Sequence, residues 1–304
     1  MSVTNCETFD EHVPTLREVK REISSIVGLR EIKKQLESIL EKIIGAEKDA
    51  AKGFRVVPPK PFHMVFVGRN GTVTYEKLDS QCCIAVKVRL KKIYLEKEEW
   101  EDYYEGKSTV ARIIGKLFYL AGVLSSYTLT EMQGHQKIRD ANGGLLLVKI
   151  DEEDPISSDT MEELIAAMDK GKSSIVLAGN HRALNQYMKC NLNLYRRFST
   201  RLQFDDLTCE DLAMILEKKA SIKGESDMLC GFELDSSCST DSIARTIAEL
   251  TPQNLRSLLN AHLLDQMLIE AKKVATPGEK TISLKNLEMG VQNGAEIFKN
   301  LLNL

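Results

Sequence analysis

The sequence predicts an α/β fold with a parallel sheet, followed by a separate helical region. Three largely apolar runs, at 65–67, 145–150 and 175–178, have the length and composition of buried strands. Helical patterns lie between them, and strands that alternate with helices are typical of a parallel sheet covered on both faces. From about residue 208 the apolar spacing is helical only, which indicates a second domain built from helices.

The remaining elements follow from local patterns. Apolar residues recur at three- and four-residue steps over 14–52, which predicts a long helix. Prolines at 58, 59 and 61 end that helix before the first strand. A short strand is expected at 201–204, and the capping-box sequence TCED at 208–211 begins the helical domain. The other helices are expected at 107–124, 161–168, 240–250, 253–273 and 283–302.

Two segments that lie apart in the chain combine into a phosphate-binding sequence. Residues 62–72, FHMVFVGRNGT, run from the first strand into a glycine-rich turn, and residues 106–115, GKSTVARIIG, begin a helix. Joined, they read GRNGTGKST, which matches the P-loop pattern G-x-x-x-x-G-K-[ST]. Residues 73–105 separate the halves. Because backbone N–H groups at a helix N-terminus bind phosphate, the joined motif predicts a nucleotide site.

Polar residues follow three of the predicted strands. Thr72, Asp151 and Asn180 come after the first, second and third strand. Ligands of parallel sheets lie at the carboxyl ends of the strands. We therefore expect these residues to lie near the nucleotide.

The composition argues against several classes of protein. The chain has 304 residues, a formal net charge of −3 and a pI near 6.1, which is unlike a general nucleic-acid-binding protein. No apolar run reaches the roughly 20 residues that a membrane-spanning helix needs. Seven cysteines without a CxxC pair fit reduced thiols and disfavour a zinc site. The first residues lack signal or transit-peptide composition, so we expect a cytoplasmic protein, with the nucleus as the alternative.

With this layout the chain resembles the AAA+ ATPases, and within them the CbbX/CfxQ branch, most closely plant members that carry ankyrin repeats elsewhere. The resemblance covers most of the chain except 73–105 and the extreme termini, and the sequence contains no ankyrin repeat. The segments that carry it are 26–36, IVGLREIKKQL, the two P-loop halves, 141–148, ANGGLLLV, 175–179, IVLAG, 192–204, LNLYRRFSTRLQF, and 254–256, NLR.

The resemblance implies a domain division and an activity. Residues 1–25 would be an N-terminal extension, 26–207 the nucleotide-binding α/β domain with the insertion 73–105 inside its P-loop, and 208–304 a helical lid. The implied activity is ATP hydrolysis with Mg²⁺, used to remodel a protein partner within an oligomeric ring such as a hexamer. The partner is unknown, the ring would be homo- or hetero-oligomeric, and neither nucleic acid nor a membrane is expected as a partner.

The resemblance also implies which residues contact the nucleotide. The adenine would lie against Ile26, Val27 and Gly28. Lys107 would hold the β- and γ-phosphates, and Ser108, or Thr109 beside it, would bind Mg²⁺ together with Asp151. The phosphate-binding residues would be Gly68, Gly71, Thr72, Gly106, Lys107, Ser108 and Thr109.

Further residues match the family's catalytic segments. Asp151 and Glu152 would be the acidic pair after the second strand, and Asn180 would orient the attacking water. Arg196 and Arg197 match the arginine-finger segment, which acts on a neighbouring subunit. Arg256 matches the lid arginine that responds to the nucleotide.

Each of these roles has an ordinary structural alternative. Lys107 could be a solvated lysine, although its flanking residues argue against this. Asn180 could be a turn residue after its strand, Arg196 and Arg197 a solvated basic edge, and Arg256 part of a helix surface.

The acidic pair departs from the family's spacing. Family members have two glycines, four apolar residues and then Asp-Glu, whereas here Lys149 and Ile150 occupy the acidic positions. If the strand is two residues longer than in the family, Asp151 and Glu152 face the same sides of the sheet as the family's acidic pair. They would then lie about 6.6 Å further along the strand than that pair. A solvated acidic loop is the alternative for this pair. A bulge would restore the spacing.

Two further departures concern the segments around the P-loop. The segment 73–105 could be a lid or docking hairpin, since Ile84, Val86, Val88 and Leu90 alternate with other residues as in a strand. We favour the interpretation that it is extraneous sequence, such as a translated intron, because its turns do not tie it to the sheet. The stretch 125–142 is shorter than in the family and has no visible pore loop, which argues against substrate threading.

These departures leave three hypotheses open. The chain is an ATP-binding AAA+ ATPase with weakened hydrolysis, a non-hydrolysing scaffold or adaptor subunit of such an assembly, or a defective gene product.

Overall fold

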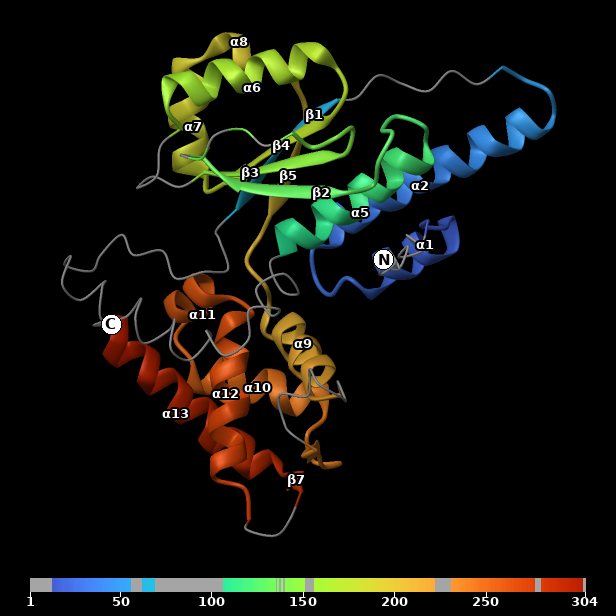
Figure 1. Cartoon of the computed structure of the whole chain (residues 1–304). Coiled ribbons are helices and arrows are strands. Elements are labelled where there is room, and N and C mark those ends of the chain that lie inside the picture. The colour runs from blue at the N-terminus through green and yellow to red at the C-terminus, as the bar shows by residue number, and fades with distance from the viewer. Residues whose placement is uncertain are drawn as a thin grey trace, which may run out of the picture.

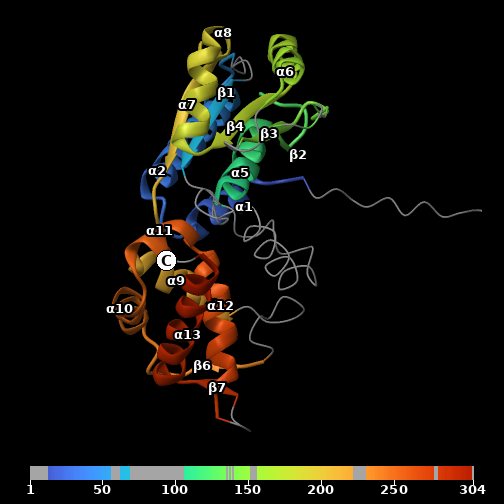
Figure 2. The same ribbon diagram turned by 90° about the vertical axis from the view of Figure 1, so that its left-hand side faces the viewer.

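The computed structural model describes residues 13–55, 62–68, 106–134, 136, 138, 140–150, 156–221, 231–276 and 280–302. A sheet with helices on both sides forms one part, and a bundle of helices forms the other (Figures 1 and 2). The segment 73–105, with both its interpretations, lies outside the described residues.

Five parallel strands form the sheet, in the order β2-β3-β4-β1-β5. Their bounds are β1 His63–Gly68, β2 Leu129–Gln133, β3 Leu145–Ile150, β4 Ser174–Gly179 and β5 Phe198–Phe204. The predicted parallel sheet is therefore confirmed, and β5 begins three residues earlier than expected. β1, β3 and β4 form the centre, where every residue except Lys149 is buried, which is why their sequences are mostly apolar.

β2 was not predicted from the sequence. It is the edge strand next to β3, and most of its residues are only partly buried. An edge strand of this kind contains too few apolar residues to stand out as a buried run. Its presence adds a strand, and a carboxylate at Glu131, beside the helix that begins at Gly106.

Helices cover both faces of the sheet. α1, α2 and α5 lie on one side, and α6, α7 and α8 lie on the other (Figure 1). Leu145 and Leu147 belong to the core on the α5 side, while Leu146 and Val148 belong to the core on the α6 side. Alternate residues of β3 therefore face opposite layers. The bounds are α1 Leu16–Ser25, α2 Arg30–Ala51, α5 Gly106–Leu120, α6 Ser158–Lys170, α7 His181–Cys190 and α8 Leu192–Tyr195.

The long helix expected at 14–52 is two helices, α1 and α2. The first helix ends at Ser25, and between the two helices Gly28 and Leu29 have φ values of 69° and 46°, which are left-handed and interrupt the helical path. A Cβ atom at Gly28 would lie 2.9 Å from the Leu207 side chain and 3.2 Å from Asp211. The glycine thus lets the α1–α2 turn pack against the segment that leads into the helical region.

The C-terminal helices share an apolar core of their own. Thr208 and Asp211 cap the first of them reciprocally, as the capping-box sequence predicts. The helix expected at 253–273 is interrupted at Asn260, which has a φ of 44°. The helices are α9 Cys209–Ser221, α10 Thr240–Leu250, α11 Gln253–Leu259, α12 His262–Lys273 and α13 Leu284–Leu302. A short parallel pair, β6 Glu233–Leu234 and β7 Thr281–Ile282, corrects the expectation that no strand occurs here.

The contact between α12 and α13 depends on one glycine, which gives a stability prediction. A Cβ atom at Gly290 would lie 2.5 Å from the Ala271 nitrogen and 2.6 Å from the Met267 oxygen, both backbone atoms. We expect Gly290→Ala to lower the free energy of unfolding by about 1–3 kcal/mol, because overpacking exceeds the gain of about 1 kcal/mol in helix propensity. Chemical denaturation measures this change.

Gly294, one turn further along α13, is the matched control. A Cβ atom there would lie 3.3 Å from the nearest atom of Met267, so only a small adjustment is needed. We expect Gly294→Ala to be close to neutral. Equal losses in the two variants would contradict this description of the helix contact.

Within the described residues, none of the helices combines the length and apolar character needed to cross a membrane.

Candidate functional site

The described ends of the two halves of the predicted phosphate-binding sequence meet at the carboxyl end of β1. Lys107, in the first turn of α5, is buried with 8% of its surface exposed, and its Nζ donates a hydrogen bond of 2.8 Å to the Gly68 carbonyl oxygen. Gly68 is the last residue of β1. Residues 39 positions apart in sequence are thus in direct contact. Gly71 and Thr72, which would complete the loop, lie outside the described residues.

Gly68 has a packing role beside its place in the motif. A Cβ atom at this position would lie 2.4 Å from the backbone oxygen of Phe204, at the end of the neighbouring strand β5. Only a glycine allows this close approach of β1 and β5. Both strands therefore end at the same place, next to Lys107.

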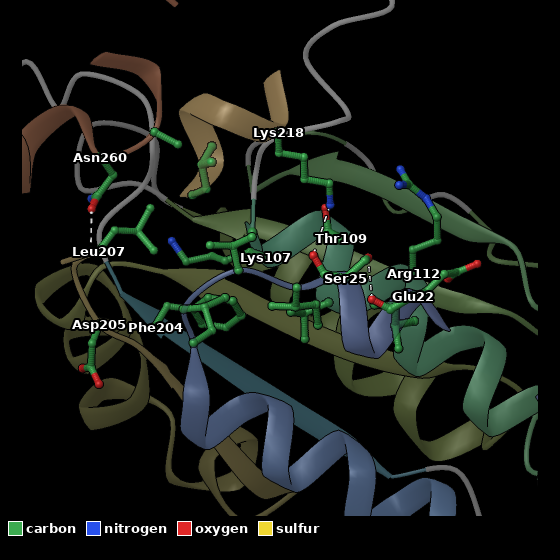
Figure 3. Close-up of a pocket in the computed structure, with 18 of the residues that line it drawn as sticks. Glu22, Ser25, Lys107, Thr109, Arg112, Phe204, Asp205, Leu207, Lys218 and Asn260 are labelled. Atoms are coloured by element: carbon green, nitrogen blue, oxygen red, sulfur yellow. Dashed lines mark hydrogen bonds between the residues drawn. The ribbon is translucent and has the colours of Figure 1, made fainter. Parts of the chain in front are cut away.

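A cavity of about 440 Å³ opens beside Lys107 (Figure 3). This volume lies within the range of small-molecule sites. Its wall combines the α1–α2 turn, the start of α5, the segment after β5, α9 and the α11–α12 turn. The residues that line it are Glu22, Ser25, Ile26, Val27, Leu29, Gly106, Lys107, Thr109, Val110, Arg112, Ile113, Lys116, Phe204, Asp205, Asp206, Leu207, Ile215, Lys218, Asn260, Ala261 and His262.

The cavity has an apolar part and a basic part. Ile26, Val27 and Phe204 are among its apolar residues, whereas Lys107, Arg112, Lys116 and Lys218 supply cations. The wall also includes the carboxylates of Glu22, Asp205 and Asp206, and Glu22 forms a 2.6 Å ion pair with Lys116. A flat apolar group and a polyanion could therefore bind side by side. Of the residues expected to contact a nucleotide, Ile26, Val27, Gly106, Lys107 and Thr109 line the cavity.

Two contacts connect the walls of the cavity. Lys218 of α9 donates a hydrogen bond of 3.1 Å to the carbonyl oxygen of Ser25, the last residue of α1 (Figure 3). The Asn260 side chain accepts a 3.1 Å hydrogen bond from the backbone nitrogen of Leu207. The helical region is thus attached to the sheet region around the opening.

Ser108 lies behind the cavity and faces β2. It is 1% exposed, and its Oγ donates a hydrogen bond of 3.1 Å to Oε2 of Glu131. The same Glu131 oxygen lies 2.9 Å from Nζ of Lys149 on β3. Sequence reasoning did not identify Glu131. An acidic residue within LTEMQ was the available signal, but its meaning depends on the pairing of β2 with β3.

β3 contains the two residues that strict spacing would align with the family's acidic pair. β3 includes Lys149 and Ile150, and Ile150 is 1% exposed within the core on the α6 side. Asp151 and Glu152 lie outside the described residues.

Asn180 lies at the carboxyl end of β4, where it caps α7. Its Oδ1 accepts a 2.7 Å hydrogen bond from the Ala183 backbone nitrogen. Capping engages the oxygen, so its amide nitrogen is the group that could donate to a ligand or water. Asn180 is not among the described residues that line the cavity.

Arg196 and Arg197 lie just before the amino end of β5. Lys107 lies at the other end of the sheet, where the parallel strands have their carboxyl ends. Arg196 is exposed, and Arg197 forms an ion pair of 2.9 Å with Asp169 of α6. Burial, and secondly the Arg197 charge, lower the pKa of the nearby His63. Neither arginine can reach the cavity of its own chain, because the length of β5 separates them from it.

Arg256 contacts the end of α10. Its guanidinium donates to the Thr251 carbonyl oxygen and, at 3.2 Å, to the Thr251 hydroxyl. It is absent from the described cavity wall, which includes Asn260 of the following turn. In this conformation Arg256 therefore stabilises the helical region.

The chain is similar in sequence to several known proteins. A family described as a domain of unknown function, DUF8495, matches residues 206–295. Stage V sporulation protein K of Bacillus subtilis is 28% identical over 228 residues, which cover 67% of this chain and 60% of that protein. The ESX-1 secretion system protein EccA1 of Mycobacterium tuberculosis is 25% identical over 226 residues, which cover 66% and 34%.

The chain thus spans less than two thirds of the length of these relatives. Among solved structures, a point mutant of Thermotoga maritima RuvB superimposes with a TM-score of 0.50 at 15% identity, over 90% of this chain and 70% of that one. The five-stranded parallel sheet, its surrounding helices and the helical C-terminal region give this protein the fold of an AAA+ P-loop NTPase.

Proposed function

We propose that this protein binds ATP in the cavity beside Lys107 and acts on a protein partner within an oligomeric assembly. The observation that carries the proposal is the 2.8 Å contact between Lys107 Nζ and the Gly68 carbonyl oxygen. It brings the described ends of the split phosphate-binding sequence together at the mouth of a cavity of about 440 Å³.

The chemistry of the cavity fits the two ends of ATP. The phosphates would lie at the N-terminus of α5, where Lys107 and backbone N–H groups favour anions. The adenine would lie against Ile26 and Val27, with Gly28 behind them. Gly71 and Thr72 would complete the phosphate loop. Thr109 contributes a hydroxyl to the cavity wall.

Hydrolysis would depend on residues that are not part of the described cavity wall. Asp151 and Glu152 are the proposed acidic pair, and Asn180 would orient water through its amide. Arg196 and Arg197 lie at the amino ends of the strands, away from the cavity of their own chain. We therefore propose that they act on the nucleotide of a neighbouring subunit, as the CbbX/CfxQ resemblance implies. Arg256 would need to leave the end of α10 before it could respond to a nucleotide.

A second candidate function is a non-hydrolysing scaffold or adaptor subunit. The side chains of Lys149 and Ile150 favour it, since an ammonium and a buried apolar group occupy the family's acidic positions. Such a subunit would keep the nucleotide pocket and the arginine edge while another subunit hydrolyses ATP. We propose 26–207 as the nucleotide domain and 208–304 as the lid in either case.

A calorimetric titration tests the proposal, in which the purified full chain is titrated with ATP and with ADP. We expect saturable one-to-one binding, and ATP at about 100 times its Kd should raise the free energy of unfolding by about 2.7 kcal/mol. Phosphate release from ATP would favour the enzyme, and binding without release would favour the scaffold. Absence of binding by both nucleotides would disprove the proposed ATP site.

A further inference from the structure

A positive charge of the protein itself lies next to the phosphate-binding helix. Oε2 of Glu131 is 3.1 Å from Ser108 Oγ and 2.9 Å from Lys149 Nζ, so the hydroxyl and the ammonium share one carboxylate oxygen. The side chains of Lys149 and Glu131 are 27% and 23% exposed to solvent. The ammonium is therefore held close to Ser108 at a partly solvated position.

The pairing of β2 with β3 fixes this arrangement. Glu131 lies opposite Leu147, and Lys149 lies opposite Gln133. Leu147 and Lys149 are two residues apart, so they face the same side of the sheet as Glu131. Leu147 packs in the core on the α5 side. Lys149 is thus directed toward the layer of the phosphate-binding helix by the register of the sheet.

The described residues around Ser108 do not fit Mg²⁺. Mg²⁺ requires oxygen ligands at about 2.0–2.1 Å in an octahedral arrangement. The carboxylate of Glu131 contacts Ser108, and the ammonium of Lys149 already contacts the oxygen that the serine uses. Lys149 would repel a dication placed there, and it offsets the attraction of the Glu131 carboxylate for such an ion.

We propose that Lys149 acts as a tethered cation that takes the place of Mg²⁺ beside Ser108, so that the protein binds metal-free nucleoside di- and triphosphates. This inference rests on the proposed nucleotide site. An ammonium neutralises phosphate charge without the coordination geometry of a metal. The cation is a permanent part of the chain, and binding is therefore independent of the Mg²⁺ concentration.

The alternative is that Lys149 and Glu131 form an ion pair that only stabilises the sheet edge. The two roles differ in their response to chelation. A tethered cation predicts nucleotide binding in EDTA that depends on Lys149. A structural ion pair predicts that Lys149 affects unfolding alone.

The test measures ATP and ADP affinity of the full chain by calorimetry, in EDTA and in MgCl₂. We expect the two conditions to agree within about threefold for the natural sequence, less than the tenfold change that corresponds to 1.4 kcal/mol. Lys149→Met should weaken binding in EDTA by about tenfold or more. Lys149→Asp should bind ATP only when MgCl₂ is present, since it supplies a second carboxylate.

Two variants separate charge from folding. Lys172→Met removes an exposed lysine in the turn before β4 and should bind as the natural sequence does. Glu131→Gln removes the ion pair but keeps the ammonium, so binding in EDTA should be retained. A structural ion pair predicts that Glu131→Gln and Lys149→Met behave alike in both binding and thermal unfolding.

Three results would overturn the inference. Binding of ATP by the natural sequence only with MgCl₂ would refute the tethered cation and leave the proposed ATP site intact. Equal binding in EDTA by Lys149→Met and the natural sequence would do the same. Absence of binding in both conditions would refute the proposed site and this inference together.

Discussion

Replacing Lys107 by Met is expected to weaken ATP binding strongly. Lys107 is buried at the contact between β1 and α5, and its Nζ lies 2.8 Å from the Gly68 carbonyl oxygen, so its charge has a fixed position at the proposed phosphate site. Loss of one partner of a buried, charged hydrogen bond costs about 2–5 kcal/mol. This corresponds to a decrease in affinity of about 30- to 5,000-fold. Calorimetric titration with ATP measures it.

The same substitution at Lys172 is the control for loss of a positive charge. Lys172 is exposed, lies in the turn before β4 and is not among the described residues of the cavity wall. Circular dichroism would establish that both variants are folded. If Lys107→Met binds ATP as tightly as Lys172→Met, the nucleotide does not bind beside Lys107.

The contact between the two motif halves in the candidate site could be predicted from the sequence, because it depends on short motifs. Gly68 and Lys107 were assigned to one phosphate site, and their described atoms are in contact. That assignment needed only an apolar strand before the first half and a helix after the second half. The central strands were predicted for a similar reason, since strands buried on both faces are continuously apolar.

The parts that were missed depend on contacts between distant segments. Glu131 lies near Ser108 because β2 pairs with β3, and neither the existence of β2 nor its register is visible in a half-exposed segment. The break between α1 and α2 arises where Gly28 and Leu29 adopt left-handed conformations against Leu207. Periodicity continues across such a turn, which explains why one helix was expected.

A second large effect is expected from the buried ion pair that joins α9 to α12. The Lys219 side chain is 1% exposed, and it forms an ion pair and a hydrogen bond with Asp265, which is 13% exposed. Asp265→Ala leaves a buried ammonium without this carboxylate, and breaking a buried pair in this way costs about 3–5 kcal/mol. Urea unfolding monitored by circular dichroism measures the loss.

The pH dependence of this loss has a definite sign. Burial lowers the pKa of Lys219 below 10.5, and the Asp265 carboxylate opposes that effect. Without Asp265 the pKa of Lys219 in the folded state decreases further, so the unfolded state binds more protons in the interval below 10.5. The stability of Asp265→Ala should therefore increase as the pH rises toward 10.5, and it should increase more than that of the natural sequence.

The double variant Lys219→Met with Asp265→Leu distinguishes electrostatics from packing. It removes both charges and keeps apolar volume, and such replacements are often neutral or stabilising by about 1–4 kcal/mol. Lys218 and His262, near the same ends of α9 and α12, line the cavity, so Asp265→Ala should also weaken ATP binding while the double variant retains it. If both variants lose the same stability, packing rather than the ion pair holds α9 against α12.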